Sequence, residues 1–325
     1  MFKASVEVGD RAGPGRTIAG TPRVMSGGAC AGRLPIDSGP YARPDGDAMT
    51  PSITGIRLRP KYVREAISYP VRELWFEVRA EDYMTAKGWD LALLEELRAA
   101  GHEISLHDGG MSLAANTGPD LERAAALKRL VDRLEPKLVS EHLTWSRPDG
   151  RCLPDLLPVP RSNEVLARCA ENIARVQDLL GRQILIENPT HYLDLRDHSW
   201  SETSFLSELS RRSNCGLLID VNNVAIGSHN TGFVASEWLD AIPAGRVGGI
   251  HLGGHSLDFG GTLLVRSDDA PVSDQVWELY RQFVDRIGPR PTSIDHGGKV
   301  PSFSELMRER AHAQNILRGG LALAA

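Results

Sequence analysis

The stretch LVSEHLTW, residues 138–145, begins as a short apolar run of β-strand character and ends on two polar side chains, Glu141 and His142. The same pattern recurs along the chain in ISLH, ILIEN, LLIDVNN, GGIHLGGH and TSIDH, which carry His107, Glu187 with Asn188, Asp220, His251 and Asp295. Amphipathic stretches of helical length separate these runs, as at residues 121–136 and 163–181. Alternating strand and helix patterns predict βα units and a parallel sheet.

Strand-like runs followed by helical stretches continue from IRLR (56–59) to PTSIDH (291–296), and they complete the eight units of a closed barrel. We therefore predict an α/β fold, a single (β/α)8 TIM barrel over residues 51–318 with a frayed tail at 319–325. In such a barrel the carboxyl ends of all strands open onto one face, which carries the chemistry. Polar side chains at the strand ends should therefore converge in one pocket.

Two segments receive a more specific prediction. GLLIDVNNV (216–224) is expected as the sixth strand with a loop over 225–233, and a long loop is expected after the seventh strand, 247–254.

Residues 1–50 are rich in Gly, Pro, Arg, Ser and Asp and have almost no apolar periodicity. They are interpreted as a disordered extension, or as a mis-assigned start with translation beginning at or near Met49.

The composition narrows the class of protein. Of 325 residues, 41% are hydrophobic and 24% charged, which is ordinary for a soluble globular protein. The net charge of -5 argues against nucleic-acid binding through a basic surface. No apolar run approaches the roughly 18 residues that span a bilayer, and no signal-peptide pattern opens the chain. The four cysteines show no CxxC spacing, so we expect a cytoplasmic protein with no membrane partner.

The polar strand ends are candidate metal ligands. Five occupy comparable places on strands four to eight, and a sixth lies on strand three: Glu141, Glu187, Asp220, His251, Asp295 and His107. Carboxylates and imidazoles together suit Zn, Mn or Fe, and a pocket without cysteine favours Mn or Fe over structural zinc. The alternative is that each acid caps a helix or forms a salt bridge. Four acids and a histidine on five consecutive strands favour a shared metal site.

Neighbouring residues have alternative roles. His255 is either a ligand or a hydrogen-bond donor to one. Asn188, and Asn222 or Asn223, either ligate or orient a substrate through the amide, or form turns. His142 follows Glu141, so strand alternation turns it to the opposite face, where packing is expected. The glycines near residue 254 lack a dinucleotide-binding context, and no GxSxG elbow is present.

The chain resembles the multinuclear non-heme iron-dependent oxidative enzymes, long catalogued as domain of unknown function 692, the family of the methanobactin biosynthesis oxygenase. The resemblance runs from about Gly55 to Asn315 and rests on FEVRAEDYM, SLHDGGMSL, LVSEHLTWS, DLLPVP, RVQDLLGR, LIENPTHYL, GLLIDVNNV, GGIHLGGH and VWELYR. It implies a TIM barrel with two or three irons and dioxygen as co-substrate. It also implies a Cys-containing, ribosomally made precursor peptide as substrate and a small partner protein that presents it.

The resemblance implies a ligand set with departures. The positions that match are His107, Glu141, Asn188, Asp220, His251 and Asp295. Arg79 and Asp82 stand where the family usually has His and Asn, and Thr231 replaces a family His. His296 and Gly297 replace Trp and Asp. Arginine cannot ligate a cation, so at least one iron of the usual cluster is in doubt, and His229 and His296 are candidates to replace missing imidazoles.

The leading hypothesis is an iron- and dioxygen-dependent oxidation of peptide cysteine, with Asp82 and His255 as hydrogen-bonding or acid–base groups. Arg79 either pairs with a substrate carboxylate or forms a salt bridge to Glu81 or Asp82. One alternative is a redox-neutral divalent-metal enzyme of the sugar isomerase or endonuclease type. The other is a barrel that has lost catalysis and only binds a precursor peptide.

Overall fold

The computed structural model describes residues 53–69, 74–84, 91–145, 157–195, 198–267, 269–296 and 301–323. The predicted extension over residues 1–50 lies outside these ranges, as do Cys30 and Cys152. Cys169 and Cys215 are buried and free.

Eight parallel strands close into a barrel in the order β1-β10-β7-β6-β5-β4-β3-β2. The strands are β1 Thr54–Arg57, β2 Leu74–Arg79, β3 Glu103–Asp108, β4 Val139–His142, β5 Leu185–Glu187, β6 Gly216–Asp220, β7 Val247–Leu252 and β10 Thr292–Ile294. Sequence neighbours pair throughout, and β10 closes the ring onto β1 with Thr54 opposite Thr292. The predicted TIM barrel is confirmed.

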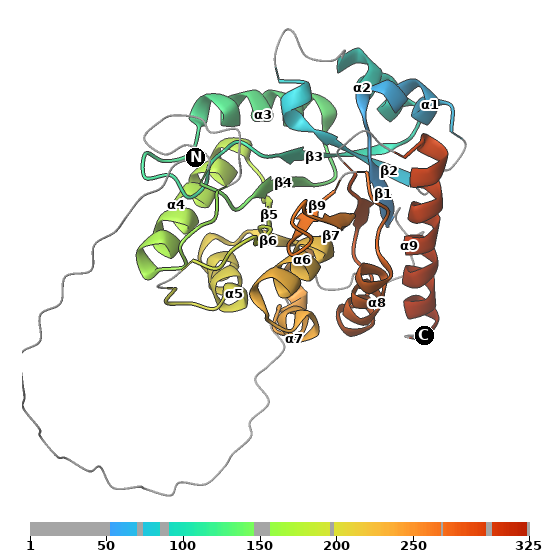
Figure 1. Cartoon of the computed structure of the whole chain (residues 1–325). Coiled ribbons are helices and arrows are strands. Elements are labelled where there is room, and N and C mark those ends of the chain that lie inside the picture. Colours follow the sequence, from blue (N-terminus) through green and yellow to red (C-terminus); the bar gives the residue numbers. More distant parts are fainter. Residues whose placement is uncertain are drawn as a thin grey trace, which may run out of the picture. The chain divides into compact units, whose positions relative to one another are not determined.

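Helices surround the strands of the barrel (Figure 1). The α-helices are α1 Val63–Ile67, α2 Leu91–Ala99, α3 Leu121–Leu134, α4 Asn163–Leu180, α5 Glu202–Ser213, α6 Val221–Thr231, α7 Ala235–Asp240, α8 Asp274–Ile287 and α9 Phe303–Leu323. Short 3₁₀ helices lie at η1 Pro60–Tyr62, η2 Ala80–Asp82 and η4 Ala244–Arg246. Within the described residues, no helix is long and apolar enough to cross a membrane.

Local chemistry fixes where these helices begin. Asp120, Ser162, Ser201 and Ser273 each accept a hydrogen bond from a backbone N–H of the first turn of α3, α4, α5 and α8, respectively. Such N-caps satisfy donors that a helix start leaves unpaired. Apolar residues at helical spacing then pack each helix on the barrel, as on α8, where Val276, Tyr280 and Phe283 are buried.

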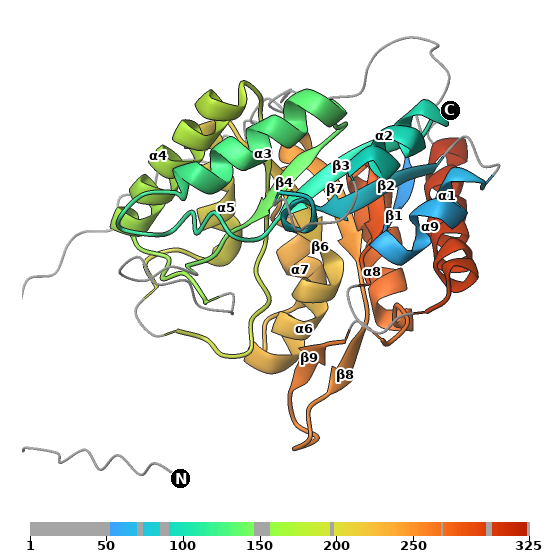
Figure 2. The same cartoon turned by 90° about the horizontal axis from the view of Figure 1, so that it is seen from above.

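Three segments differ from the sequence prediction. Residues 221–231 form α6 rather than a strand end and loop, because Asp220 accepts a hydrogen bond from Asn223 N and starts a helix there. The expected long loop after β7 contains an antiparallel hairpin of β8 His255–Leu257 and β9 Leu264–Arg266. This hairpin projects from the barrel (Figure 2). Helix α9 extends to Leu323, past the predicted fraying point at 319, because Leu and Ala favour helix.

Candidate metal centre

The ends of β3, β4 and β5 bring two histidines and a glutamate together. Strand pairing places His107 opposite Ser140 and His142 opposite Glu187. His107 Nε2 lies 3.0 Å from His142 Nε2, and His142 Nδ1 lies 2.8 Å from Glu187 Oε2. The other ring nitrogen of His107 is 2.8 Å from Ser140 Oγ, which fixes the ring orientation. These side chains therefore point into the barrel mouth.

The phase of β4 is the reverse of the sequence prediction. His142, expected on the opposite face, reaches the cluster, whereas Glu141 turns away from it. Glu141 Oε2 accepts a hydrogen bond from Met111 N at 3.3 Å, and its Oε1 accepts one from His142 N at 3.0 Å. Asp108 lies beside Glu141 and forms an ion pair with Arg123. Alternation along the strand holds, but Ser140 rather than Glu141 shares the inward face with His142.

A second pair of candidate ligands comes from β2 and β7, which are separated in the barrel by β1 and β10. His251 on β7 lies with its Nε2 3.0 Å from Glu77 Oε1, and Glu77 belongs to β2. The Nδ1 atom of His251 is 3.4 Å from Glu187 Oε1. The two histidine rings of His107 and His251 meet edge to face, with centroids 5.4 Å apart. Glu77, His107, Glu187 and His251 are each at most 3% exposed.

Metal-ligand atoms in this cluster fall into three groups in which all members lie within 4.8 Å of one another. The groups are Glu77 with His107 and His251, His107 with His142 and Glu187, and Glu187 with Asp220 and His251. Four buried atoms of these groups have no hydrogen bond of good geometry: Glu77 Oε1, both carboxylate oxygens of Glu187, and His251 Nδ1. The three carboxylate oxygens lie 2.8 to 3.4 Å from histidine ring nitrogens. Buried carboxylates are normally hydrogen-bonded, so oxygens held among imidazoles in this way fit a bound cation.

The charge states of these groups depend on one another. Burial together with His142 lowers the pKa of His107 well below its ordinary value, which favours the neutral imidazole that metals require. Burial opposes charge on His251, but Glu77 and Glu187 raise its pKa well above the ordinary value. Burial also opposes charge on Glu187, yet His142 and His251 hold its pKa well below the ordinary value. An anionic Glu187 next to imidazoles is a suitable cation ligand.

Asp220 lies at the edge of this cluster, and both of its carboxylate oxygens accept hydrogen bonds from other residues. Its Oδ1 accepts Asn223 N at 2.8 Å as the N-cap of α6, and its Oδ2 accepts Arg266 Nη1 at 2.5 Å. Asn188 joins β5 to β6, since its Oδ1 accepts Asp220 N and its Nδ2 donates to Asp220 O. The amide of Asn188 is therefore used for strand positioning.

Asp295 is held between two arginines. Its Oδ1 accepts Arg57 Nη1 at 2.5 Å, and its Oδ2 accepts Arg266 Nη2. Burial would raise the pKa of Asp295, but Arg57 and Arg266 lower it far below the ordinary value. The nearest cluster contact is His251 Nδ1, 3.8 Å from Asp295 Oδ2. Asp295 thus adjoins the metal-ligand groups without belonging to one.

The remaining predicted site residues lie outside these groups. His255 Nδ1 is 2.7 Å from Asn222 Oδ1, and His229 Nε2 is 3.1 Å from the carbonyl oxygen of Thr262. Arg79 is exposed and donates two hydrogen bonds to Glu81, in agreement with the salt-bridge alternative. Asp82 ends η2, where burial raises its pKa despite Arg79. His296 pairs with Glu309 at 2.5 Å.

Sequence reasoning missed Glu77, His142 and Arg266 as members of this region. A signal existed for Glu77, because a charged residue between Phe76 and Val78 in an apolar strand is rarely buried without a partner. Arg266 gave no signal, since it reaches the site from a hairpin that the sequence did not predict.

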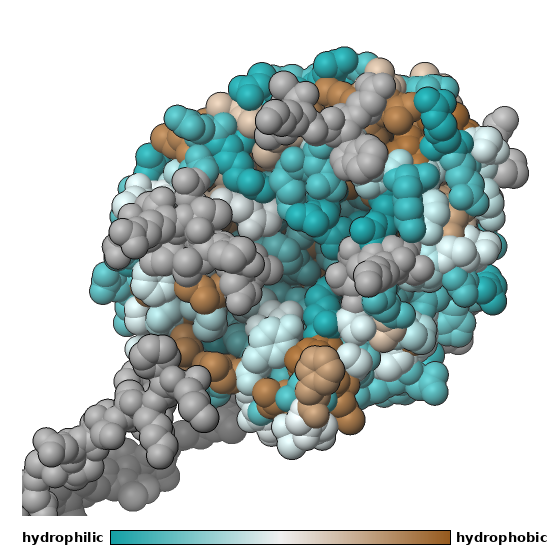
Figure 3. Space-filling model, turned by 45° about the horizontal axis from the view of Figure 1, so that its top comes forward, coloured by the Kyte–Doolittle hydropathy of each residue, from teal (hydrophilic) through white to brown (hydrophobic). Residues whose placement is uncertain are grey.

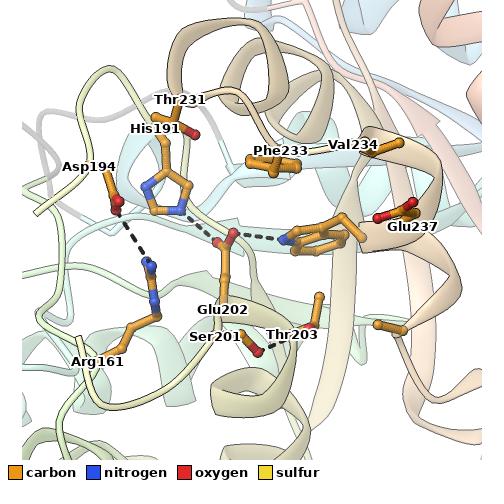
Figure 4. A pocket seen from close by; sticks show the side chains of 12 residues that line it. Arg161, His191, Asp194, Ser201, Glu202, Thr203, Thr231, Phe233, Val234 and Glu237 are labelled. Carbon is orange, nitrogen blue, oxygen red and sulfur yellow. Dashed lines mark hydrogen bonds and ion pairs between the residues drawn. The ribbon is translucent and has the colours of Figure 1, made fainter.

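The surroundings of the centre are polar. Hydrophilic side chains gather around a hollow in the middle of one face (Figure 3). A separate pocket of about 360 Å³ lies between the loop after β5 and helices α5 to α7. Inside it His191 Nε2 is 2.8 Å from Glu202 Oε1, and Trp238 Nε1 donates to the other oxygen (Figure 4). Both oxygens of Glu202 are therefore paired with the protein.

Similarity to other proteins covers nearly all of the barrel. Residues 53–318 match the family described as RiPP precursor modification enzyme MbnB/TglH/ChrH. A UPF0276 protein of Caulobacter vibrioides is 49% identical over 84% of this chain and 97% of its own length. Another from Rhizobium meliloti is 42% identical over 75% of this chain and 79% of its own length.

Solved structures show the same fold at low identity. D-psicose 3-epimerase from Clostridium cellulolyticum H10 has a TM-score of 0.52 at 12% identity, covering 83% of this chain and 97% of its own. A xylose isomerase domain protein from Planctomyces limnophilus has a TM-score of 0.52 at 15% identity, covering 82% and 95%. At this identity the likeness concerns the barrel alone.

Proposed function

The chain belongs to the MbnB/TglH/ChrH family of enzymes that modify precursors of ribosomally made, post-translationally modified peptides, and from this premise we propose that it oxidises cysteine residues of such a peptide. Iron is the proposed metal and dioxygen the proposed co-substrate. The observation that carries the proposal is the buried cluster of carboxylates and imidazoles at the barrel mouth, in which candidate ligand atoms lie within 4.8 Å of one another.

The residues that would hold the metal are Glu77, His107, His142, Glu187 and His251. Two carboxylates and three imidazoles match the ligand types of non-heme iron. When bound, iron supplies a Lewis-acidic position for the substrate thiolate and electrons for dioxygen. The other proposed ligands, Glu141, Asn188, Asp220, Asp295 and His229, have protein partners that hold them in place.

The protein's own contribution to the reaction would be positioning and proton control. Glu187 lies between His142 and His251 and fixes the direction of both rings. Neutral His107 presents Nε2 to the cluster, because its Nδ1 is engaged by Ser140. His255 and Asp82 are proposed as acid–base groups nearer the rim, where both are partly exposed. Arg79 keeps Glu81 paired, and on substrate binding it is proposed to exchange that partner for a peptide carboxylate.

The test uses protein reconstituted with ferrous iron under anaerobic conditions and a Cys-containing precursor peptide encoded beside the gene. We expect iron to be retained, dioxygen to be consumed and the peptide mass to change. A peptide with Ser in place of Cys, and the variant Glu187→Gln, should both be inert. His191→Ala is the matched control, since His191 lies outside the cluster and should preserve activity. Co-expression with a small neighbouring gene tests the proposed peptide-presenting partner.

Other outcomes identify the competing functions. Retained manganese or zinc with no dioxygen uptake would favour a redox-neutral enzyme of the sugar isomerase or endonuclease type. Peptide binding without stoichiometric metal would favour a barrel that only binds the precursor. A protein that binds neither metal nor peptide would contradict the proposal.

A further inference from the structure

At one side of the barrel mouth the two acids, Asp220 and Asp295, contact an arginine. At the other side the two acids, Glu77 and Glu187, contact histidines. The side chain of Arg266 extends from β9 and lies between Asp220 and Asp295. Asp220 is the last residue of β6, and Asp295 follows β10 directly. It makes four hydrogen bonds there, two through each terminal nitrogen. Nη1 donates to Asp220 Oδ2 at 2.5 Å and to Asn223 Oδ1 at 3.1 Å. Nη2 donates to the Asp295 carbonyl oxygen at 3.3 Å and to its Oδ2.

The backbone is shaped to admit this guanidinium. A Cβ atom on Gly253 would lie 3.3 Å from Arg266 Nη2 and 3.1 Å from the Asp295 carbonyl oxygen. Both distances are tighter than ordinary van der Waals contact, so glycine leaves the room that Arg266 occupies. Arg266 is only 22% exposed at its side chain, and Asp220 is fully buried. A planar fork of donors suits this arrangement of carboxylates.

Charge separates the two sides of the mouth. Asp220 and Asp295 are balanced by Arg266 and Arg57, one positive charge for each negative one. No described arginine or lysine pairs with Glu77 or Glu187 in an ion pair; their partners are histidines. A divalent ion beside Arg266 would be repelled by it, whereas an ion between Glu77 and Glu187 would meet net negative charge.

We propose that Arg266 is the resident cation between Asp220 and Asp295, so that divalent ions bind on Glu77, His107, His142, Glu187 and His251 and none binds between the two aspartates. Arg266 thereby sets the number of ions in the centre. The inference rests on the proposed metal centre and deepens it. It makes Asp220 and Asp295 anchors for arginine rather than metal ligands.

The experiment measures bound Mn²⁺ per chain by equilibrium dialysis for wild type and Arg266→Ala. We expect Arg266→Ala to bind about one more ion per chain, because it frees Asp220 Oδ2 and Asp295 Oδ2 and a volume for a hydrated cation. Adding Asp220→Asn to that variant should remove the gain, since Asn keeps the helix-capping oxygen but loses the charge. Arg266→Lys keeps a cation and should match wild type. Arg79→Ala is the matched control, because it removes a rim arginine that touches neither aspartate.

The outcomes separate this inference from the metal centre itself. If the wild type binds no Mn²⁺, the proposed metal centre and the role of Arg266 are both rejected. If wild type binds Mn²⁺ and a folded Arg266→Ala shows no gain, the role of Arg266 is rejected and the centre stands. Wild-type crystals soaked in Mn²⁺ give an independent answer that does not depend on the variant folding. Anomalous peaks beside Glu187 and none between Asp220 and Asp295 support the inference, and a peak within ligand distance of both aspartates overturns it.

Discussion

His142 Nδ1 lies 2.8 Å from Glu187 Oε2 across the β4–β5 pair, and Glu187 also faces His107 and His251. Glu187 therefore joins two of the three ligand groups and is central to the candidate centre. We expect Glu187→Gln to weaken metal affinity by about 100-fold, because the amide is neutral and a weaker ligand. Metal content after gel filtration measures this. His142→Ala should also lower metal content.

Glu141→Gln is the matched control on the neighbouring position. Burial and Asp108 raise the pKa of Glu141 well above its ordinary value, which favours the neutral carboxyl that Gln resembles. We expect Glu141→Gln to retain wild-type metal content. Loss of metal in this variant, with His142→Ala unaffected, would show that Glu141 rather than His142 reaches the ion.

Metal uptake should release a proton from His251. Burial opposes charge on this imidazole, but Glu77 and Glu187 raise its pKa well above the ordinary value, which favours the protonated ring in the metal-free site. A metal must displace that proton, and affinity should therefore increase as pH rises toward the raised pKa. Calorimetry in buffers of different ionisation enthalpy counts the released protons. Binding enthalpies independent of the buffer would contradict this expectation.

The same shift predicts how the metal-free protein responds to alkali. A folded-state pKa above the unfolded value of about 6.5 gives stability that is complete below that value and is lost as pH rises through the folded pKa. The melting temperature of the metal-free protein should decline on the alkaline side, and the decline should be smaller in His251→Asn.

How far the sequence predicts this structure depends on how local the signal is. The eight strands follow from apolar runs and turn residues, which are local patterns. The phase of β4 does not follow, because a barrel strand is buried on both faces and neither Val139 nor Ser140 marks the inside. The contact between Ser140 and His107 settles the phase, and it joins residues 33 positions apart.

The site was predictable to a similar degree. Most of its members end strands, so the convergence of His107, Glu187, Asp220 and His251 could be expected from barrel topology. The side chains that pair with these residues could not be expected from barrel topology. Arg266 reaches Asp220 from 46 residues away and Asp295 from 29, through a hairpin without a strong sequence signal. The sequence therefore does not distinguish a carboxylate that ligates a metal from one that pairs with an arginine.

The Asp295 ion pairs should support stability above about pH 4. Arg57 and Arg266 lower the pKa of this buried carboxyl, so its contribution is present above the unfolded pKa of about 3.9 and is lost as pH falls toward the folded pKa. Asp295→Asn should lower the free energy of unfolding at pH 7 by about 3 kcal/mol, because the partly buried Arg57 loses its charged partner. Urea unfolding at pH 7 and at about pH 2 measures both effects, because the loss begins only below the unfolded pKa. A variant as acid-sensitive as wild type would assign the acid loss to other carboxyls.

Asp220 has two separable roles, the start of α6 and the pairing of Arg266. Asp220→Ala removes both, and the lost cap alone should cost about 1 kcal/mol in the free energy of unfolding. Asp220→Asn keeps an oxygen for Asn223 N, so it should recover most of that cost while Arg266 still pairs with Asp295. Urea titration of the two metal-free variants gives the comparison. If Asn destabilises as much as Ala, the charge on Asp220 stabilises this end of the barrel more than the helix cap does.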